Sequence, residues 1–307
     1  MNSAKLVLFF RKSNLSEIKS NNEFIPHVRN LEKEMESCQK SLKISDEEMK
    51  QIQENNKKPK KKLTQAMRVH LREREYKNWC DLKSKGKGVE SFKDCKDVNK
   101  RIMEKRGLTN TEWIQILKMN GQVAPVRALH GRGQDNRCRH CDEIETLGHV
   151  LGFCDRGYLL RNTRHNTVRT LIADEFRRLK WNVYEEVHCI NPSRSTQRID
   201  ILIYKNKNDK SYILDPTIRI ETGGNQPEEV NMEKKAHYDS VIQYFKDKYK
   251  LADIEVIGLF IGARGTISLD FENFRTKFDL SKEMRNNIAL SVIQSSVQNL
   301  QHHTYNL

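Results

Sequence analysis

The 307-residue sequence lacks any long apolar run. A membrane-spanning helix needs about 20 consecutive, mostly apolar residues. The apolar stretch from Leu6 to Phe10 is also shorter than the roughly 7–15 residues of a signal-peptide core. The sequence therefore predicts neither membrane insertion nor secretion.

Acidic residues are scarce relative to basic ones. Lys and Arg number 55 against 41 Asp and Glu, which gives a formal net charge of +14. Such an excess indicates a polyanionic partner, either nucleic acid or an anionic membrane surface. Only 36% of residues are hydrophobic and 31% are charged, so we do not expect a buried core along the whole chain. Seven cysteines, an odd number, without an export signal favour a reduced compartment and metal binding or burial over disulfides.

Residues 1–62 are predicted to be a solvated helical extension that ends in a Lys-rich linker. Ser45 and Glu48 have the spacing of a capping box, which marks the start of a helix. Pro59 lacks a backbone N–H and sits among lysines that repel one another, so the helix should stop there. Two interpretations of the lysine run remain open, a nuclear-import or phosphate-binding patch and a solvated boundary. Its candidate nucleic-acid-binding residues are Lys60, Lys61 and Lys62.

Residues 63–135 are predicted to be a basic helical linker region. Within 57–106 there are 18 Lys and Arg against 7 Asp and Glu. A second capping box joins Thr109 to Glu112. Aromatic residues are spaced through the region and could either stack on bases or pack in a helical core. They are Trp79, Phe92 and Trp113.

Residues 136–157 carry a metal-ligand pattern, Cys138-x2-Cys141-x7-His149-x4-Cys154. Zinc takes four tetrahedral ligands, and a Cys-x2-Cys turn presents two thiolates to one ion. Four protein ligands leave no position for a catalytic water, so the site is predicted to be structural. The alternative is that these are ordinary reduced thiols. Two other histidines compete as ligands, His140 and His165.

Residues 158–307 are predicted to form an α/β module. Apolar residues recur at helical spacing from residue 158 onward, and after Trp181 the pattern becomes that of strands. The expected order is a helix, three strands, a helix, a strand and a terminal helix. The expected strands are 183–190, 199–204, 212–220 and 254–261, and the later helices are 232–249 and 283–300.

Two aspartates in this module form a candidate catalytic site. A hairpin would place Asp200 and Asp215 on neighbouring strands. Asp215 lies in an apolar run where an unpaired charge would be costly to bury, so it needs a cation. Two carboxylates can bind Mg²⁺, and Lys234 on the following helix would complete a site for metal-assisted phosphodiester hydrolysis. The alternative is that both aspartates are structural residues at strand ends.

Several motifs together resemble one family. They are Trp79-Cys80-Asp81-Leu82-Lys83-Ser84-Lys85-Gly86-Lys87-Gly88-Val89, Leu108-Thr109-x-x-Glu112-Trp113-Ile114, Cys138-x2-Cys141, Glu145-Thr146-Leu147-Gly148-His149-Val150-Leu151, Cys154, Arg164-His165-Asn166 and Gly262-Ala263-Arg264-Gly265. Over roughly three quarters of its length the chain resembles the C-terminal part of the polyprotein of site-specific non-LTR retrotransposons, the type-2 retrotransposable element that inserts in ribosomal DNA.

The resemblance implies a CCHC zinc knuckle followed by a restriction-like endonuclease of the PD-(D/E)XK class, with an α-β-β-β-α-β core. In that family the domain nicks target DNA, and the free 3′-hydroxyl primes reverse transcription. The implied cofactors are structural Zn²⁺ and catalytic Mg²⁺ or Mn²⁺. The implied partners are duplex DNA and possibly the element RNA, with no membrane and no small-molecule cofactor, and the implied localisation is nuclear.

The resemblance also assigns residues. The catalytic residues it implies are Asp200, Asp215, Lys234 and His237. The nucleic-acid contacts expected near the knuckle are Arg161, Arg164 and His165. The sequence departs from the family pattern twice: Ile199 stands where a proline precedes the first aspartate, and His237 beside Tyr238 stands where a further lysine is usual.

The sequence lacks the reverse transcriptase palm. That palm needs paired aspartates in a Tyr/Phe-x-Asp-Asp turn, and no Asp-Asp pair occurs in the chain. We therefore expect a truncated copy or a fragment of a longer polyprotein. Two alternatives to an endonuclease remain open, a non-catalytic nucleic-acid-binding protein and a relic without activity.

Overall fold

The fold is taken from a computed structural model, in which the chain divides into two compact units, Met1–Asp81 and Leu82–Leu307. Each unit is considered by itself. The segment boundaries predicted at residues 62, 135 and 157 lie within these units and stay predictions. The predicted lysine contacts at 60–62 lie outside the described residues. The structure describes residues 39–40, 42–55, 63–129, 135–190 and 195–305.

The first unit contains helices α3 (Asp46–Asn55) and α4 (Leu63–Cys80). The predicted capping box is confirmed: the Glu48 N–H donates to Ser45 Oγ at 3.1 Å, and the Ser45 N–H donates to the Glu48 carboxylate at 2.7 Å. This backbone hydrogen bond, together with contact to His70 of α4, lowers the pKa of Glu48 to about 2. A deprotonated Glu48 therefore both starts α3 and links it to α4.

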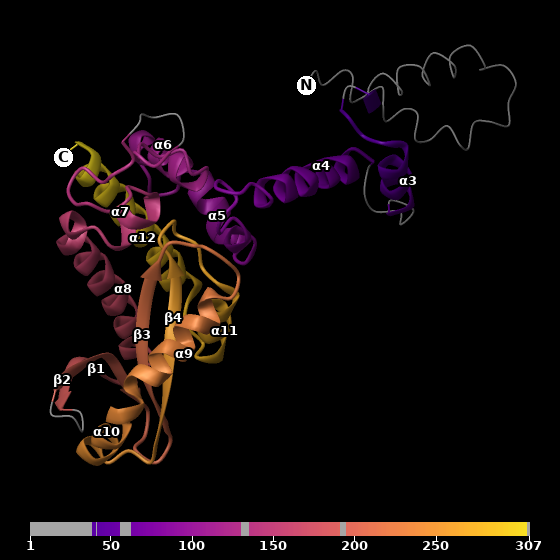
Figure 1. The fold of residues 1–307 in the computed structure, drawn as a ribbon. Helices are drawn as coiled ribbons and strands as arrows, with labels where there is room; N and C mark the ends of the chain where they lie inside the picture. Colours follow the sequence, from indigo (N-terminus) through magenta and orange to yellow (C-terminus); the bar gives the residue numbers. More distant parts are fainter. Residues whose placement is uncertain (1–38, 41, 56–62, 130–134, 191–194, 306–307) are drawn as a thin grey trace, which may run out of the picture. The chain divides into compact units, whose positions relative to one another are not determined.

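The second unit is built on a four-stranded mixed sheet in the order β1-β2-β3-β4 (Figure 1). The β1–β2 and β2–β3 pairs are antiparallel, and the β3–β4 pair is parallel. The predicted strands are confirmed, and a turn over residues 206–209 joins β2 to β3. Parallel neighbours need a crossover connection, which the helices after β3 provide. The strands are β1 (Asn182–Ile190), β2 (Thr196–Tyr204), β3 (Lys210–Arg219) and β4 (Asp253–Gly262).

Helices follow the predicted order, with two differences. The helix predicted over 232–249 is two helices, separated by a 3-10 turn at Asp239–Val241. A helix between β4 and the terminal helix was not predicted, because its nine residues show little amphipathic periodicity. Ser268 caps it by accepting the Phe271 N–H at 3.1 Å. The helices are α8 (Tyr158–Arg178), α9 (Gln226–Tyr238), α10 (Ile242–Tyr249), α11 (Leu269–Lys277) and α12 (Lys282–Tyr305).

The sheet is covered on both faces, because side chains of a strand alternate in direction. On one face, Ile201 and Ile203 of β2 belong to a large apolar cluster with residues of α8, α11 and α12. On the other face, Leu202 belongs to a second cluster with Tyr238 of α9 and Phe245 of α10. The unit is thus a mixed α/β fold whose sheet lies between two helical layers.

Three short helices precede α8 in the second unit, α5 (Lys96–Met103), α6 (Asn110–Asn120) and α7 (Leu147–Gly152). The capping box predicted at Thr109 and Glu112 is confirmed at the start of α6. Buried residues of α5, α6 and α7 belong to the same apolar cluster as the sheet. The part of the basic segment from Cys95 to Leu129 is therefore packed against the α/β core.

The aromatic side chains of this basic segment make contacts with cations. The Arg264 guanidinium lies 5.0 Å from the centre of the Phe92 ring, and the Lys105 ammonium lies 4.6 Å from that of Trp113. Both rings are half-buried in the second unit. These contacts favour a packing role for the two aromatics over base stacking.

A buried ion pair brings two of the sequence motifs together. Arg264 is 0% exposed, and its Nε donates to Glu221 Oε2 at 2.9 Å. Its Nη2 donates to the Lys87 carbonyl at 3.1 Å, across 177 residues of chain. The next residue, Gly88, has φ +67°, and a Cβ there would lie 2.1 Å from the Glu221 carbonyl oxygen. A Cβ on Gly262 would likewise lie 2.0 Å from Glu221 Oε1, so Gly88 and Gly262 are required by close packing around one charge pair.

We expect Gly88→Ala to destabilise the second unit by at least about 2 kcal/mol. The added Cβ overlaps backbone atoms and would occupy a left-handed conformation, so the loop must move away from Arg264. Gly223→Ala is the matched control, because a Cβ there has no atom within 4 Å. Its free energy of unfolding should stay within about 0.5 kcal/mol of wild type. Urea unfolding compares the two, and equal midpoints would contradict the prediction.

A candidate metal centre and a candidate carboxylate site

The Cys/His motif folds as a tight turn followed by a short helix. A β-bridge between Arg137 and Ile144 closes the turn, and the Cys138 N–H donates to the Glu143 carbonyl at 2.7 Å. Thr146 caps α7 by accepting the His149 N–H at 3.0 Å, which puts His149 in the first turn of that helix. Cys154 follows two residues after the helix ends. Local sequence signals thus position all four side chains.

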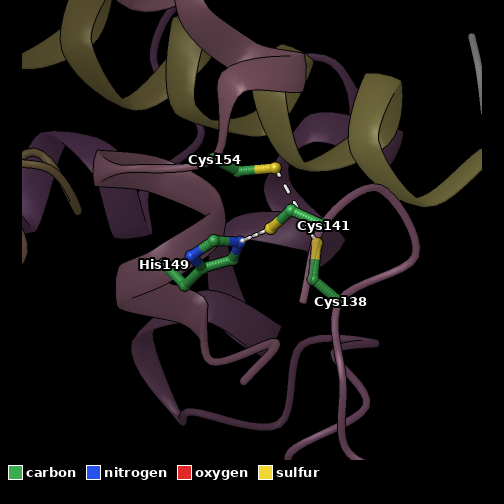
Figure 2. Close-up of side chains that lie close together, drawn as sticks. All are labelled: Cys138, Cys141, His149 and Cys154. Carbon is green, nitrogen blue, oxygen red and sulfur yellow. Dashed lines mark hydrogen bonds between the residues drawn. The ribbon is translucent and has the colours of Figure 1, made fainter. Parts of the chain in front are cut away.

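The four predicted zinc ligands converge, as Figure 2 shows, and their ligand atoms all lie within 4.8 Å of one another. Cys138 Sγ lies 3.8 Å from Cys154 Sγ, and Cys141 Sγ lies 3.2 Å from His149 Nε2. Three thiolates and one imidazole are a donor set that suits tetrahedral Zn²⁺. The cluster can therefore hold a metal such as zinc in a closed, structural site.

The rival histidines are held elsewhere. His140 Nε2 lies 2.8 Å from the His303 carbonyl oxygen, to which it can donate. His165 lies against Asp200, at 3.1 Å between Nε2 and Oδ2. Neither is in the Cys138, Cys141, His149 and Cys154 group.

A buried carboxylate to which sequence reasoning gave no role organises the turn of the candidate metal centre. Glu145 is fully buried and accepts the backbone N–H groups of Arg127 and Arg139 at 2.9 and 3.0 Å. The Arg139 guanidinium also donates to Glu145 at 2.7 Å. A buried carboxylate without these donors would be strongly unfavourable. Glu145 therefore holds the turn that carries Cys138 and Cys141 and ties it to Arg127.

The two candidate catalytic aspartates lie on adjacent central strands, as predicted. The paired part of β2 and β3 ends with Ile201 and Leu214, and Asp200 and Asp215 are the next residues on their strands. Both side chains are buried, Asp215 at 3% exposed. Two buried carboxylates on neighbouring strands need cations or hydrogen-bond donors to be stable.

Asp215 has such partners on α9. Lys234 Nζ lies 3.0 Å from Asp215 Oδ2, and the Tyr238 hydroxyl donates to the same oxygen at 2.8 Å. Thr217 Oγ1 donates to the other carboxylate oxygen at 3.1 Å. Burial and the charge of Asp215 raise the pKa of Tyr238, so its phenol remains a donor. Tyr238 had no role assigned from sequence, although its position four residues after Lys234 puts both on one helical face.

Asp200 contacts a residue of α8 and lies next to an irregular part of β1. Its carboxylate pairs with His165, for which a phosphate contact was predicted. On the adjacent strand β1, Glu186 has no partner in the β1–β2 register. Its φ of +52° is a rare conformation for a residue other than glycine. Glu186 also accepts the Arg198 guanidinium at 3.0 Å. Backbone strain of this kind is often found beside functional residues.

Arg164, for which a phosphate contact was predicted, is buried, and that contact stays a prediction. Arg164 is 3% exposed, and its two terminal nitrogens donate to the Leu151 carbonyl at 3.0 Å and to Ser296 Oγ at 2.9 Å. Burial lowers the pKa of Arg164 to about 10, with a smaller effect of nearby Arg161. The charged guanidinium therefore ties α7 to α12.

Two other predicted site residues have different surroundings. Arg161 is half-buried and donates to the Cys154 carbonyl. His237 is exposed, and its ring packs edge-on against Tyr238 with ring centres 4.7 Å apart. In the described part of the chain no bond joins the His237 ring to either aspartate, so its catalytic role stays a prediction.

The second unit is thus a mixed α/β fold with a Cys₃His centre and a buried carboxylate pair. No family model matches the chain. It is 25% identical over 162 residues to the "Retrovirus-related Pol polyprotein from type-1 retrotransposable element R2" of Popillia japonica. The match covers 52% of this chain but 33% of that relative. This similarity supports a relationship to non-LTR retrotransposons. No helix in the described residues has the length and apolar character needed to cross a bilayer.

Proposed function

We propose that the chain is the nucleic-acid-processing module of a non-LTR retrotransposon, a metal-dependent endonuclease that nicks duplex DNA. One observation carries this proposal: buried Asp215 is paired with Lys234, and a second buried carboxylate, Asp200, lies on the neighbouring strand β2. A carboxylate pair with an adjacent lysine is suited to metal-assisted phosphodiester hydrolysis. We also propose that the protein acts in the nucleus, where its DNA substrate lies.

The topology supports a restriction-like module. Helix α8 is followed by three antiparallel strands, the crossover helices α9 and α10, and then the parallel strand β4. This is the α-β-β-β-α-β order expected from the sequence. The two aspartates lie on β2 and β3, the central strands, where neighbouring elements can reach them from both faces.

The Cys₃His cluster supports the zinc-knuckle part of the proposal. In this proposal it holds structural Zn²⁺ and keeps α7 in place, while the basic surface of the chain binds duplex DNA or the element RNA. Phosphate contacts of that kind give affinity without sequence specificity.

The residues around the carboxylates fit a divalent cation. Asp200 and Asp215 would supply two oxygen ligands, and water or phosphate oxygens would supply the rest, as Mg²⁺ prefers. When bound, Mg²⁺ or Mn²⁺ would polarise the scissile phosphate and lower the pKa of a bound water. Lys234 would shift from Asp215 toward the phosphate and stabilise its developing charge. Tyr238 would keep Asp215 in orientation by its hydrogen bond.

The test is nicking of a supercoiled plasmid by the purified full chain. Open-circular product should form with Mg²⁺ or Mn²⁺ and be absent with EDTA. Binding without nicking under any of these conditions would reject the endonuclease and favour a non-catalytic binding protein. Absence of both DNA binding and nicking would indicate a relic without activity.

We expect Lys234→Ala to slow nicking at least about tenfold, or about 1.4 kcal/mol of barrier. The substitution removes the cation that lies 3.0 Å from Asp215. Lys235→Ala is the matched control, because Lys235 is the exposed neighbour on the same helix. Single-turnover nicking at saturating DNA measures both. A Lys234→Ala rate within twofold of wild type would remove Lys234 from the site.

A further inference from the structure

A residue of the terminal helix lies at the candidate metal centre. His303 of α12 is 1% exposed, and its Nε2 lies 3.2 Å from Cys138 Sγ, across 165 residues of chain. The spacing of the Cys/His motif does not include this histidine. The ligand atoms of Cys138, Glu145 and His303 form a second group that lies within 4.8 Å.

We propose that His303 donates a hydrogen bond from Nε2 to the Cys138 thiolate and so makes the C-terminal helix part of the metal centre. Cys138, Cys141, His149 and Cys154 already fill a tetrahedral shell, so His303 lies outside it as a positioning residue. Hydrogen bonds to metal ligands orient them and tune the metal, and their loss typically weakens metal binding 10–100-fold.

The surroundings of His303 fix its ring in this orientation. The His140 ring packs edge-on against it with ring centres 4.7 Å apart, and His140 Nε2 lies 2.8 Å from the His303 carbonyl oxygen. Among the described residues, His303 Nδ1 has no hydrogen-bond partner. The contact of Nε2 with Cys138 is therefore the polar interaction that orients the imidazole.

Further contacts extend this connection along α12. Asn299, one turn before His303, donates to the Val150 carbonyl of α7 at 3.2 Å. Ser296, about two turns before His303, accepts from Arg164, which also donates to the Leu151 carbonyl. The metal-site segment is thus connected to three successive levels of α12. His303 contacts Cys138, Asn299 bonds to Val150, and Ser296 is linked to Leu151 through Arg164. Metal loading should consequently order the last turns of α12.

The test compares His303→Phe with His302→Phe in the full chain. Phenylalanine keeps a ring in the pocket but has no donor, and His302 is the half-exposed neighbour on the same helix. With Co²⁺ in place of zinc, loss of a hydrogen bond makes the thiolate more electron-rich. The thiolate-to-cobalt charge-transfer band should therefore move to longer wavelength in His303→Phe alone. Zinc affinity, measured by competition with a chromogenic chelator, should fall about 10–100-fold.

His303→Gln is the rescue variant, because the glutamine amide can donate from a similar position. It should recover most of the affinity and the wild-type band. An unchanged band in folded His303→Phe would overturn the proposal, and so would an equal effect of His302→Phe.

A measurement on the wild-type protein is independent of whether the variants fold. Amide hydrogen exchange of residues 296–305 should speed up when zinc is removed and slow again when zinc is restored. Exchange that is the same with and without zinc would also overturn the proposal. None of these readouts depends on nuclease activity.

Discussion

Cys141→Ser should abolish zinc binding and unfold residues 135–157, without unfolding the sheet. A serine hydroxyl is a poor zinc ligand, and ligation supplies the folding energy of such sites, about 10–16 kcal/mol in isolated zinc-finger peptides. The turn from Cys138 to Glu145 has no apolar core of its own. The sheet keeps its second cluster, which contains Leu202 and Phe245 and is separate from the metal centre.

Elemental analysis of purified protein should find one zinc per chain in wild type and almost none in Cys141→Ser. Limited proteolysis should cut the variant within 135–157 and leave wild type intact there. Cys189→Ser is the control, because Cys189 is a buried free thiol on β1 outside the metal cluster. Wild-type protein that contains no zinc would refute the assignment.

Asp200→Asn and Asp215→Asn should each reduce nicking at least about 1,000-fold, or about 4 kcal/mol of barrier. Asparagine preserves the size of the side chain, so the buried strands should keep their packing. It removes the negative charge that a divalent cation requires, while leaving an oxygen that can still accept from Tyr238 in the second variant. Affinity for DNA should stay near wild type, because phosphate contacts rather than these carboxylates give the affinity.

Single-turnover nicking and DNA binding measured without divalent metal separate the two effects. Asp209→Asn is the control from the same hairpin, because Asp209 is exposed in the turn between β2 and β3. It should retain the wild-type rate. Retained activity in both Asp200→Asn and Asp215→Asn would show that the two buried carboxylates are structural.

Local sequence patterns determined the elements of this protein and the four side chains of its candidate metal centre. Alternating and helical periodicity predicted the strands and most helices, and the capping boxes at Ser45 and Thr109 formed as expected. The Cys/His spacing selected the four side chains that converge, because all lie within 17 residues and a turn and a helix start position them. The expected hairpin also predicted that Asp200 and Asp215 lie on neighbouring strands, as they do.

The tertiary structure alone decided which distant residues complete each site. Arg164 and His165 are consecutive, yet one is buried against α7 and α12 while the other reaches Asp200. His303 approaches the metal centre from 165 residues away, and Arg264 reaches Lys87 across 177. Periodicity states which face of a helix is apolar, but not which polar group of another element will meet it. That choice follows from packing the elements around one core, where each buried charge or donor must find a partner.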